Sequence, residues 1–424
     1  MSRTFITAFL TYLLILAGLA VLSAPLLALA LPLFLYLLVS LWRVPGEIHL
    51  QVERRLSTQR ILIDDVVKVT LEVTNLGVSL EELLLEDLLP PGLEIVAGSP
   101  RRLVRLPSSR SVTWTYSLRG KRGSYALNRL CVTARDTLGL VAVRQLIDTG
   151  SQLFVVPPVL RLRRVAIQPR RTRVYSGSIP ARQGGPGVEF FDVREYQSGD
   201  APRWINWRVT ARHPLALYSN QFEQERVADV GLILDGRRRS NEFGRNSIFE
   251  HSVLATAALS EALLNAGNRV GMLFYGRHIV WTYPGYGKLQ GERILHDLSR
   301  LEPGDSEVFS ELYVPRNLFP ARSQLVLVSP LISEDYEALV ALRTQGYHLL
   351  VVSPDPVSFE LATMARTEDI MLAARIARLK RIVLFRRLLG VGIQAVDWDT
   401  FQPFEKVAKQ YLERRLILPR GVRR

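Results

Sequence analysis

The densest group of reactive side chains lies in residues 189–212, directly after the flexible breaker Gly184-Gly185-Pro186-Gly187. Arginine forms bidentate hydrogen bonds with carboxylates, and an indole that covers such a pair excludes water and strengthens it. We therefore expect ion pairs here that are covered by Trp204 and Trp207. The groups that would pair are Arg194, Arg203, Arg208 and Arg212 on one side and Glu189, Asp192, Glu195 and Asp200 on the other.

Two carboxylates of this run, Glu195 and Asp200, are the candidates for acid–base catalysis, for instance in a hydrolase of the cell envelope. With four arginines nearby, both carboxylates are expected to stay ionised, which favours a structural role. The six histidines show no metal-ligand spacing, and the sequence contains no nucleophile elbow, zinc-protease motif or P-loop. Gly285-Tyr286-Gly287-Lys288 lacks the P-loop spacing and is typical of a turn. The sequence therefore predicts a protein that is not an enzyme and holds no cofactor.

The spacing within residues 194–212 resembles the signature of the family called domain of unknown function 58. That signature is R-E-Y-x-x-G-D-x-x-R-x-I-N/H-W-x-x-T-A-R, and its many fixed spacings make it specific. The chain matches it at Arg194, Glu195, Tyr196, Gly199, Asp200, Arg203, Ile205, Asn206, Trp207, Thr210, Ala211 and Arg212. The resemblance implies two N-terminal membrane spans, a β-rich segment, this motif and a von Willebrand factor A-like domain. It also implies association with MoxR-type AAA+ ATPases, in a chaperone-like or assembly role.

A von Willebrand factor A-like domain usually carries D-x-S-x-S after its first strand, and this motif binds Mg²⁺. The matching run here is Asp235-Gly236-Arg237-Arg238-Arg239-Ser240, in which Arg237 and Arg239 replace both hydroxyl positions. Ser329-Pro330-Leu331 stands where the family places an acid, and Ser306 is a candidate for the usual threonine. A hard cation prefers oxygen ligands and is repelled by arginines. We therefore expect a degenerate metal site whose arginines meet an internal or partner carboxylate.

The elements that would position these residues form an α/β domain over residues 227–424. Short apolar strands are expected at 230–234, 270–275, 325–328, 349–352 and 393–396, with helices at 248–266, 335–343 and 404–414. Alternating strands and helices predict a doubly wound, mostly parallel sheet that is covered on both faces. Ligands in such folds bind at the carboxyl ends of the strands, where Asp235 stands.

Residues 47–158 show a different period. Val67, Val69, Leu71 and Val73 alternate with polar residues, and Val112, Trp114, Tyr116 and Leu118 repeat the pattern. Turn signals separate these runs at Asn75-Leu76-Gly77, Pro90-Pro91-Gly92, 119–123 and Leu138-Gly139. Alternating strands with regular turns predict an immunoglobulin-like β-sandwich of antiparallel sheets. Its role would be that of a spacer or docking module, with Trp114 in the core.

The first 46 residues predict a membrane anchor. No charged residue occurs between Thr4 and Trp42, and Ser23-Ala24-Pro25 lies near the middle of this run. We therefore expect two transmembrane helices, at about 5–22 and 25–41; a cleaved signal peptide or one long tilted span are the alternatives. The flanking Arg3, Arg43, Arg54 and Arg55 place both ends in the cytoplasm by the positive-inside rule.

Two basic segments follow. Residues 159–226 are expected to form a linker and the signature motif, and the linker carries Arg161, Arg163, Arg164, Arg170, Arg171, Arg173 and Arg182 without an acid. Residues 369–392 are expected to form a basic helix with Leu372, Ile376, Leu379 and Val383 on one stripe. Either segment suits anionic lipid; the alternatives are a solvated linker and an ordinary surface helix of the sheet.

Composition is consistent with a protein of several domains in a reducing compartment. The chain has 424 residues, a formal net charge of +14 and one cysteine, Cys131. The hypothesis that unites these features is a scaffold anchored in the inner membrane with its soluble domains in the cytoplasm. It would act as an adaptor for a protein partner, plausibly a MoxR-type ATPase, and would bind no nucleic acid. The alternative is the hydrolase that uses the Glu195/Asp200 region.

Overall fold

The computed structural model describes residues 3–42, 48–135, 142–162, 165–167, 172–213, 215–238, 247–304, 313–362, 364–365 and 367–413. Contacts divide the chain into two compact units, Met1–Val156 and Pro157–Arg424. Each unit is described by itself. The predicted positions Arg239 and Ser306, and the predicted turn at Leu138-Gly139, lie outside the described residues.

The first unit begins with a pair of helices, α1 (Arg3–Ala20) and α2 (Ala24–Trp42). The pair packs closely at Gly18, where an added Cβ would lie 2.9 Å from the Leu27 side chain. In the described part of the chain, no helix is long and apolar enough to cross a membrane. The predicted helical hairpin is therefore present, whereas the two predicted transmembrane spans are not found. With 18 residues, α1 is about 27 Å long against a hydrocarbon core of about 30 Å.

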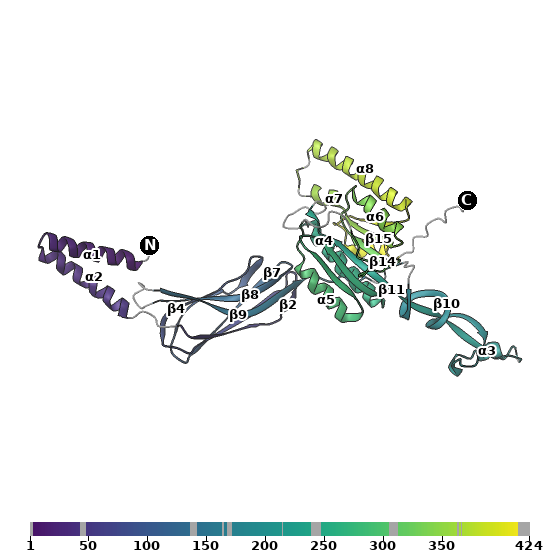
Figure 1. Cartoon of the computed structure of the whole chain (residues 1–424), viewed down its shortest axis with the longest axis horizontal. Coiled ribbons are helices and arrows are strands. Elements are labelled where there is room, and N and C mark those ends of the chain that lie inside the picture. The colour runs from purple at the N-terminus through teal and green to yellow at the C-terminus, as the bar shows by residue number, and fades with distance from the viewer. Residues whose placement is uncertain are drawn as a thin grey trace. The chain divides into compact units, whose positions relative to one another are not determined.

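A β-sandwich completes the first unit (Figure 1). One sheet has the order β1-β3-β7-β5 and is antiparallel throughout. Its strands are β1 (Leu50–Leu56), β3 (Val66–Asn75), β7 (Ser111–Gly120) and β5 (Leu93–Ala97). The other sheet has the order β2-β9-β8-β4-β6, in which only β2 and β9 are parallel. Its strands are β2 (Arg60–Leu62), β9 (Ala142–Val156), β8 (Gly123–Arg135), β4 (Leu80–Asp87) and β6 (Arg101–Leu106).

The sandwich core follows the predicted alternation. Val67, Val69, Leu71 and Val73 are fully buried, and so are the predicted core residues Trp114, Tyr116 and Leu118. Arg54 was expected to be one of the arginines that flank the membrane helices. Its side chain is buried in the sandwich, where it pairs with Asp87, and Asp87 also accepts the Tyr116 hydroxyl hydrogen bond. The strand β1 thus carries Arg54 inward, where its charge is paired inside the sandwich.

The second unit is built on a seven-stranded sheet of order β13-β12-β11-β14-β15-β16, with β10 paired to β11. All neighbours on this path are parallel except β12 and β13. The strands are β10 (Thr172–Glu195), β11 (Tyr218–Asp235), β12 (Arg269–Tyr275), β13 (Ile279–Gly285), β14 (Gln324–Val328), β15 (His348–Pro354) and β16 (Gln394–Trp398). Counted from β11, the order is 3-2-1-4-5-6, which is that of a doubly wound sheet.

Helices cover both faces of this sheet. The cluster on one face joins side chains of α4 (Ile248–Asn265), α5 (Gly287–Arg300) and α9 (Phe404–Tyr411) to Val230, Leu232 and Leu234. The cluster on the other face joins α6 (Asp335–Thr344) and α8 (Glu368–Gly390) to Ile233 and its neighbours. A short helix, α7 (Pro356–Leu361), follows β15. The mixed, mostly parallel α/β architecture was predicted; β13, α5 and α7 were not.

The region predicted as a linker is different in the structure. Residues 165–167 are part of the α/β unit, because Val165 is buried in its core and the Ala166 N–H donates to the Leu412 carbonyl at 2.8 Å. Further on, β10 and the first half of β11 form an antiparallel ribbon, from Thr172↔Ala228 to Glu195↔Tyr218. Arg163, Arg164, Arg170 and Arg171 lie outside the described residues.

Candidate functional site

The site lies where the strand order of the α/β sheet reverses, between the carboxyl ends of β11 and β14. Asp235 is the last residue of β11, and Ser329 follows β14 directly. The first residue of α6, Asp335, comes back to the same edge. The crevice at such a reversal is the usual binding position of doubly wound folds.

A guanidinium group fills this position. Arg237 donates from Nε to Asp235 Oδ1 and from Nη2 to Asp235 Oδ2, both at 2.8 Å. The same Nη2 atom donates to Asp335 Oδ1 at 2.8 Å, so that Arg237 bridges two carboxylates. The Ser329 hydroxyl donates to Asp235 Oδ2 at 2.7 Å. Asp235, Arg237 and Asp335 are 0%, 5% and 2% exposed, so this ion cluster is closed to solvent.

The backbone around Gly236 holds the arginine in place. The Gly236 N–H donates to the Tyr275 carbonyl at 2.6 Å, and its own carbonyl accepts from the Gly304 N–H at 2.9 Å. A Cβ at this position would overlap the ring of Phe274, so only glycine fits here without a shift. The chain therefore turns back at Gly236 and presents Arg237 to the carboxylate at the end of its own strand.

The charges of the cluster stabilise one another. Burial by itself would lower the pKa of Arg237, but hydrogen bonds and charge from Asp235 and Asp335 outweigh it and raise this pKa above its usual value. Burial raises the pKa of Asp335 above the ordinary range, against the opposing effect of the Arg237 charge. A buried charge without its partner is costly, whereas this arrangement provides each carboxylate with a cation and hydrogen-bond donors.

The chemistry open to this cluster is limited. Arg237 donates to both oxygens of Asp235 and to one oxygen of Asp335, so a metal ion that bridged these two carboxylates would have to displace the guanidinium. Across the described residues, no group of three or more His, Cys, Asp or Glu side chains is arranged to hold a metal ion. The sequence identified Asp235, Arg237 and Ser329 but missed Asp335. One signal in the sequence could have identified Asp335. It is an acid at the start of the helix that follows β14, and it lies six residues after Ser329, the position where the family pattern places an acid.

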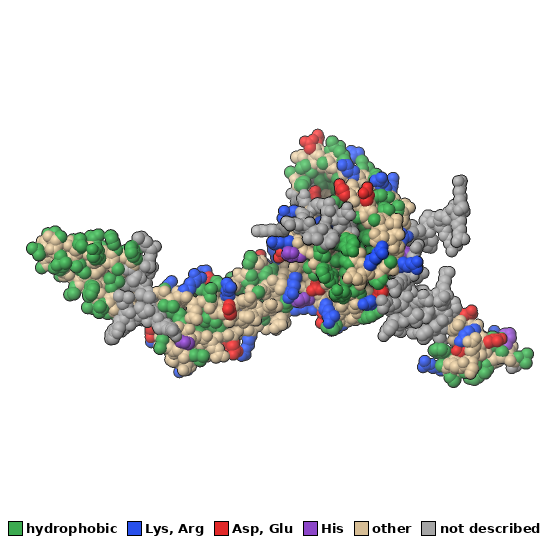
Figure 2. All heavy atoms as spheres, in the orientation of Figure 1, with side chains coloured by type: hydrophobic (Ala, Val, Ile, Leu, Met, Phe, Trp, Pro, Cys, Tyr) green, Lys and Arg blue, Asp and Glu red, His purple; other side chains and the backbone are tan. Residues whose placement is uncertain are grey.

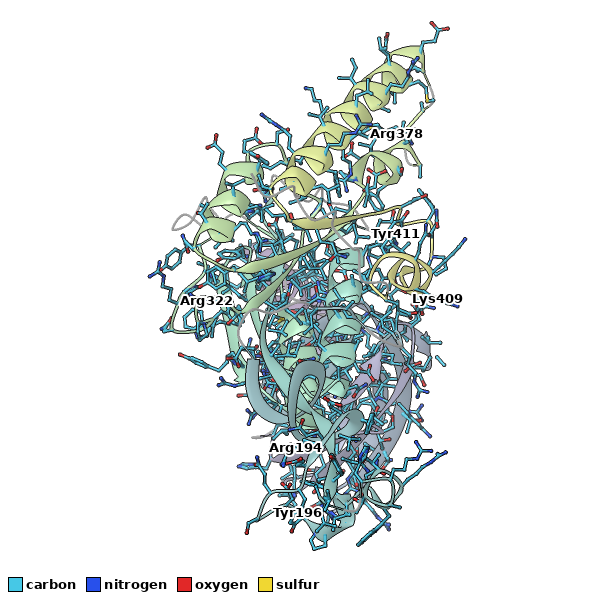
Figure 3. The ribbon with its side chains drawn as sticks, turned by 90° about the vertical axis from the view of Figure 1, so that its right-hand side faces the viewer. Arg194, Tyr196, Arg322, Arg378, Lys409 and Tyr411 are labelled. Carbon is cyan, nitrogen blue, oxygen red and sulfur yellow. The ribbon has the colours of Figure 1, made fainter. Side chains whose placement is uncertain are left out.

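The signature motif lies elsewhere, at the end of the β10–β11 ribbon (Figure 3). Arg194 Nη2 donates to Asp200 Oδ1 at 2.7 Å, and the Gln197 N–H donates to Asp200 Oδ2 at 2.9 Å. The Tyr196 hydroxyl donates to the Asp200 carbonyl at 3.0 Å. Gly199 has a φ of 110°, which favours glycine in this tight turn. These contacts account for Arg194, Tyr196, Gly199 and Asp200 as a folding unit.

The second half of the motif attaches to β11. Asn206 caps the short helix α3 (Trp207–Thr210): its Oδ1 accepts from the Val209 N–H at 3.1 Å, and its Nδ2 donates to Asn220 at 2.7 Å. Thr210 Oγ1 accepts from the Tyr218 N–H at 3.0 Å. Asparagine and threonine are thus needed because their oxygens satisfy backbone donors at the end of the ribbon.

Part of the expectation for this motif is wrong. Among the described side chains of residues 189–212, which do not include that of Glu189, Arg194–Asp200 is the one ion pair, so Arg203, Arg208 and Arg212 pair with none of Asp192, Glu195 and Asp200. Trp207 is 67% exposed and covers no pair. The hydrogen bond from Arg194 and that from the Gln197 N–H lower the pKa of Asp200, which keeps this carboxylate ionised.

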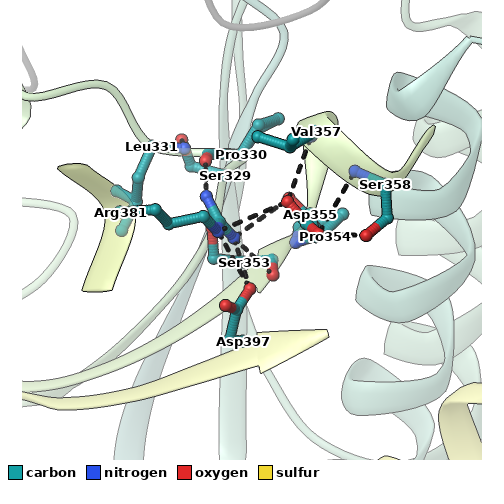
Figure 4. Close-up of polar contacts among 10 residues, drawn as sticks. All are labelled: Ser329, Pro330, Leu331, Ser353, Pro354, Asp355, Val357, Ser358, Arg381 and Asp397. Atoms are coloured by element: carbon teal, nitrogen blue, oxygen red, sulfur yellow. Dashed lines mark hydrogen bonds and ion pairs between the residues drawn. The ribbon is translucent and has the colours of Figure 1, made fainter. Parts of the chain in front are cut away.

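A second buried arginine, Arg381 of α8, lies at the same edge of the sheet (Figure 4). It donates to the Pro330 carbonyl at 2.7 Å and to the Ser353 hydroxyl at 2.9 Å, and it pairs with Asp397 at 2.7 Å. It also lies 3.6 Å from Asp355. Arg381 therefore ties α8 to the ends of β15 and β16 and to the loop after β14. The sequence showed it only as one of several basic residues of a helix.

Comparisons with known proteins agree with the motif. A family model described as "Protein of unknown function DUF58" matches residues 192–367. The uncharacterized proteins Mb1516 of Mycobacterium bovis and Rv1480 of Mycobacterium tuberculosis are each 36% identical to the chain over 93 residues, which is 21% of this chain. The chain spans about a quarter, 28%, of the length of these relatives.

Solved structures resemble only a part of the chain. The CARDB domain of the PF1109 protein from Pyrococcus furiosus is 16% identical and covers 27% of this chain and 92% of its own, with a TM-score of 0.19. A score this low carries no argument about function. The family match rests instead on the signature residues whose contacts are described above. Residues 192–367 of this chain are a domain of the DUF58 family of proteins of unknown function.

Proposed function

We propose that this protein is an interaction scaffold whose α/β unit docks a protein partner, in the manner of an adaptor for a MoxR-type AAA+ ATPase. The observation that carries the proposal is the edge strand β13. Trp281 and Tyr283 stand on one side of this strand and are 53% and 65% exposed. Thr282, between them, points the other way and donates to Asp297 of α5 at 2.6 Å.

Exposed aromatic residues at a sheet edge are suited to protein binding. Tryptophan and tyrosine are enriched at interface positions that contribute most of the binding free energy. An edge strand also has unpaired backbone groups that a partner can complete. Because Trp281 pairs across the sheet with the buried Leu273, a rigid strand presents both aromatic rings.

The ion cluster supports the same function. Arg237 forms ion pairs with both Asp235 and Asp335 and so occupies the place between them. We propose that docking by this domain is therefore independent of divalent metal ions. A scaffold of this kind needs a folded surface and no reacting group, and both carboxylate oxygens of Asp200 accept hydrogen bonds within the motif.

We further propose that the helix pair α1–α2 attaches the scaffold to the inner membrane, with the soluble units in the cytoplasm. Apolar side chains cover this pair (Figure 2), and Phe5, Phe9, Leu13, Leu16 and Leu35 are about half exposed. Exposed apolar area of this extent favours contact with lipid or an apolar partner.

Binding of the full chain, reconstituted in lipid vesicles, to a MoxR-type ATPase of the same organism tests the adaptor function. We expect binding in the presence of EDTA, and a loss of affinity of about thirty-fold or more in Trp281→Ala/Tyr283→Ala, the effect of removing one strong hot spot. Trp207→Ala is the control, since Trp207 is another exposed tryptophan, at 67%, and lies in α3 rather than in β13. No binding by the wild type, or equal binding by the double variant, would contradict the proposal. Lost function in Glu195→Gln with binding intact would instead favour the hydrolase.

A further inference from the structure

The side of helix α8 that packs against the sheet is not the side that the sequence predicts. The residues that it buries are Ala374, Arg381, Leu384 and Leu388. The stripe of Leu372, Ile376, Leu379 and Val383, which the sequence marks as the apolar face, is on the opposite side. These four side chains are 58%, 48%, 62% and 54% exposed. The apolar stripe is therefore the outer face of α8, and an ordinary surface helix with a charged outer face does not describe it.

Basic side chains line both flanks of this stripe. At about 100° per residue, Arg375 and Arg386 lie within about 70° of the stripe on one flank, and Lys380 lies within about 70° on the other. All three are exposed, and so is Arg378 (Figure 3). After Glu368 and Asp369 in its first turn, α8 contains no acidic residue. The outer surface of the helix is thus apolar along the stripe and positively charged on both sides of it.

The helix is held rigidly in this orientation. The buried guanidinium of Arg381 is fixed by Asp397 and by the Pro330 carbonyl, both at 2.7 Å. The Cζ atom of Arg381 lies 4.9 Å from the centre of the Phe385 ring. Thr367 caps the helix by accepting from the Ile370 N–H at 3.4 Å. Because α8 is already folded and anchored, a surface that binds its outer face pays little for ordering it.

We propose that the outer face of α8 docks onto an anionic lipid bilayer. A crest of leucine, isoleucine and valine can enter the boundary between headgroups and acyl chains while the flanking basic residues meet lipid phosphates. A second copy of this chain would bring the same positive flanks against each other, and like charges disfavour that contact. A bilayer with anionic lipid offers an apolar layer to the stripe and negative charge to the basic residues on its flanks.

A nitroxide label on the stripe tests the proposal in the full chain. Leu379→Cys is labelled in a Cys131→Ser background, and the protein is reconstituted in vesicles of phosphatidylcholine alone or mixed equally with phosphatidylglycerol. On the mixed vesicles we expect the label to gain contact with oxygen and to lose contact with a water-soluble nickel chelate. The matched control is Leu289→Cys on α5, which is equally exposed at 62% and should respond to neither lipid.

Charge variants identify the source of the binding. Neutralising the three flanking residues Arg375, Lys380 and Arg386 to glutamine should lower the ratio of docked to undocked domain about five-fold per residue. The same change in exposed cations of α5 and α9, Lys288, Arg293, Lys406 and Lys409, should leave it unchanged. A label at 379 that is equally open to the nickel chelate on both vesicles would overturn the proposal. Equal protection on both, with dipolar broadening between labels, would assign the face to a second copy and also overturn it.

Discussion

Replacing Arg237 by serine removes the one cation from a closed cluster and restores a hydroxyl group at that position. Asp235 and Asp335 would then stay buried without the guanidinium that bridges them, and breaking a buried pair in this way costs about 3–5 kcal/mol. Ser329 and the Ile332 N–H would still donate to these carboxylates, at 2.7 and 3.1 Å, which keeps the loss within that range. We expect Arg237→Ser to destabilise the α/β unit by about 3–5 kcal/mol.

The same variant should respond to divalent cations. Two carboxylates and two serine hydroxyls are oxygen ligands of the kind that Mg²⁺ prefers. At a concentration one hundred times its dissociation constant, the ion would return about 2.7 kcal/mol of the lost stability. The wild-type domain should show no such gain, because Arg237 occupies the carboxylates.

Urea unfolding followed by hydrogen exchange of peptides from β11 and β14 measures the stability of this unit separately from the sandwich. Arg238→Ser is the control, since Arg238 is an exposed arginine next to the cluster and its replacement should change the free energy of unfolding by less than that of Arg237. A loss below about 1 kcal/mol in Arg237→Ser would refute the argument that the buried cluster depends on this cation. An equal Mg²⁺ effect in the wild type would refute the argument that the guanidinium excludes the ion.

Three further predictions use the same unfolding measurement. Arg381→Met should destabilise the α/β unit by about 2–4 kcal/mol, because carbonyls such as that of Pro330 lose their donor, whereas Arg378→Met should have little effect. Burial lowers the pKa of His251, against the effect of Glu250. The contribution of neutral His251 to stability should therefore be complete above about pH 6.5 and should decline as the pH falls below that value. His251→Phe, which keeps a ring beside Trp398, should remove that decline. Gly236→Ala should cost about 1–3 kcal/mol because its Cβ overlaps Phe274, and an unchanged midpoint would show that the ring moves aside freely.

Much of the fold could be predicted because short-range pattern and burial agree. The alternation at Val67, Val69, Leu71 and Val73 indicated a half-buried strand, and each of these residues is buried. In the α/β unit, the expected strands at 230–234 and 325–328 coincide with the buried cores of β11 and β14. Two strands were missed: the edge strand β13, although its sequence from Ile279 to Tyr283 is rich in strand-forming residues, and β10, whose glycines and prolines indicate a loop when read alone.

The signature motif shows a different limit of sequence reasoning. Its residue types indicated arginine–carboxylate pairs covered by indoles, but Trp207 is exposed and only Arg194 pairs with Asp200 in the described residues. The fixed spacing of Asn206 and Thr210 reflects hydrogen bonds to the backbone of a ribbon. Residue types reveal which pairs are chemically allowed, whereas the backbone decides which groups meet.

The sequence by itself determined the family of residues 192–367, the change from a period of two to alternating strands and helices, and the replacement of hydroxyl positions by arginine after Asp235. Only the tertiary structure decided where the positive charge goes. Arg237 meets Asp335, 98 positions away, because parallel pairing of β11 and β14 brings the ends of two distant strands to one edge. It also decided that the stripe of α8 faces outward, since the Arg381 contacts orient that helix and a helical period alone cannot say which side a sheet will cover.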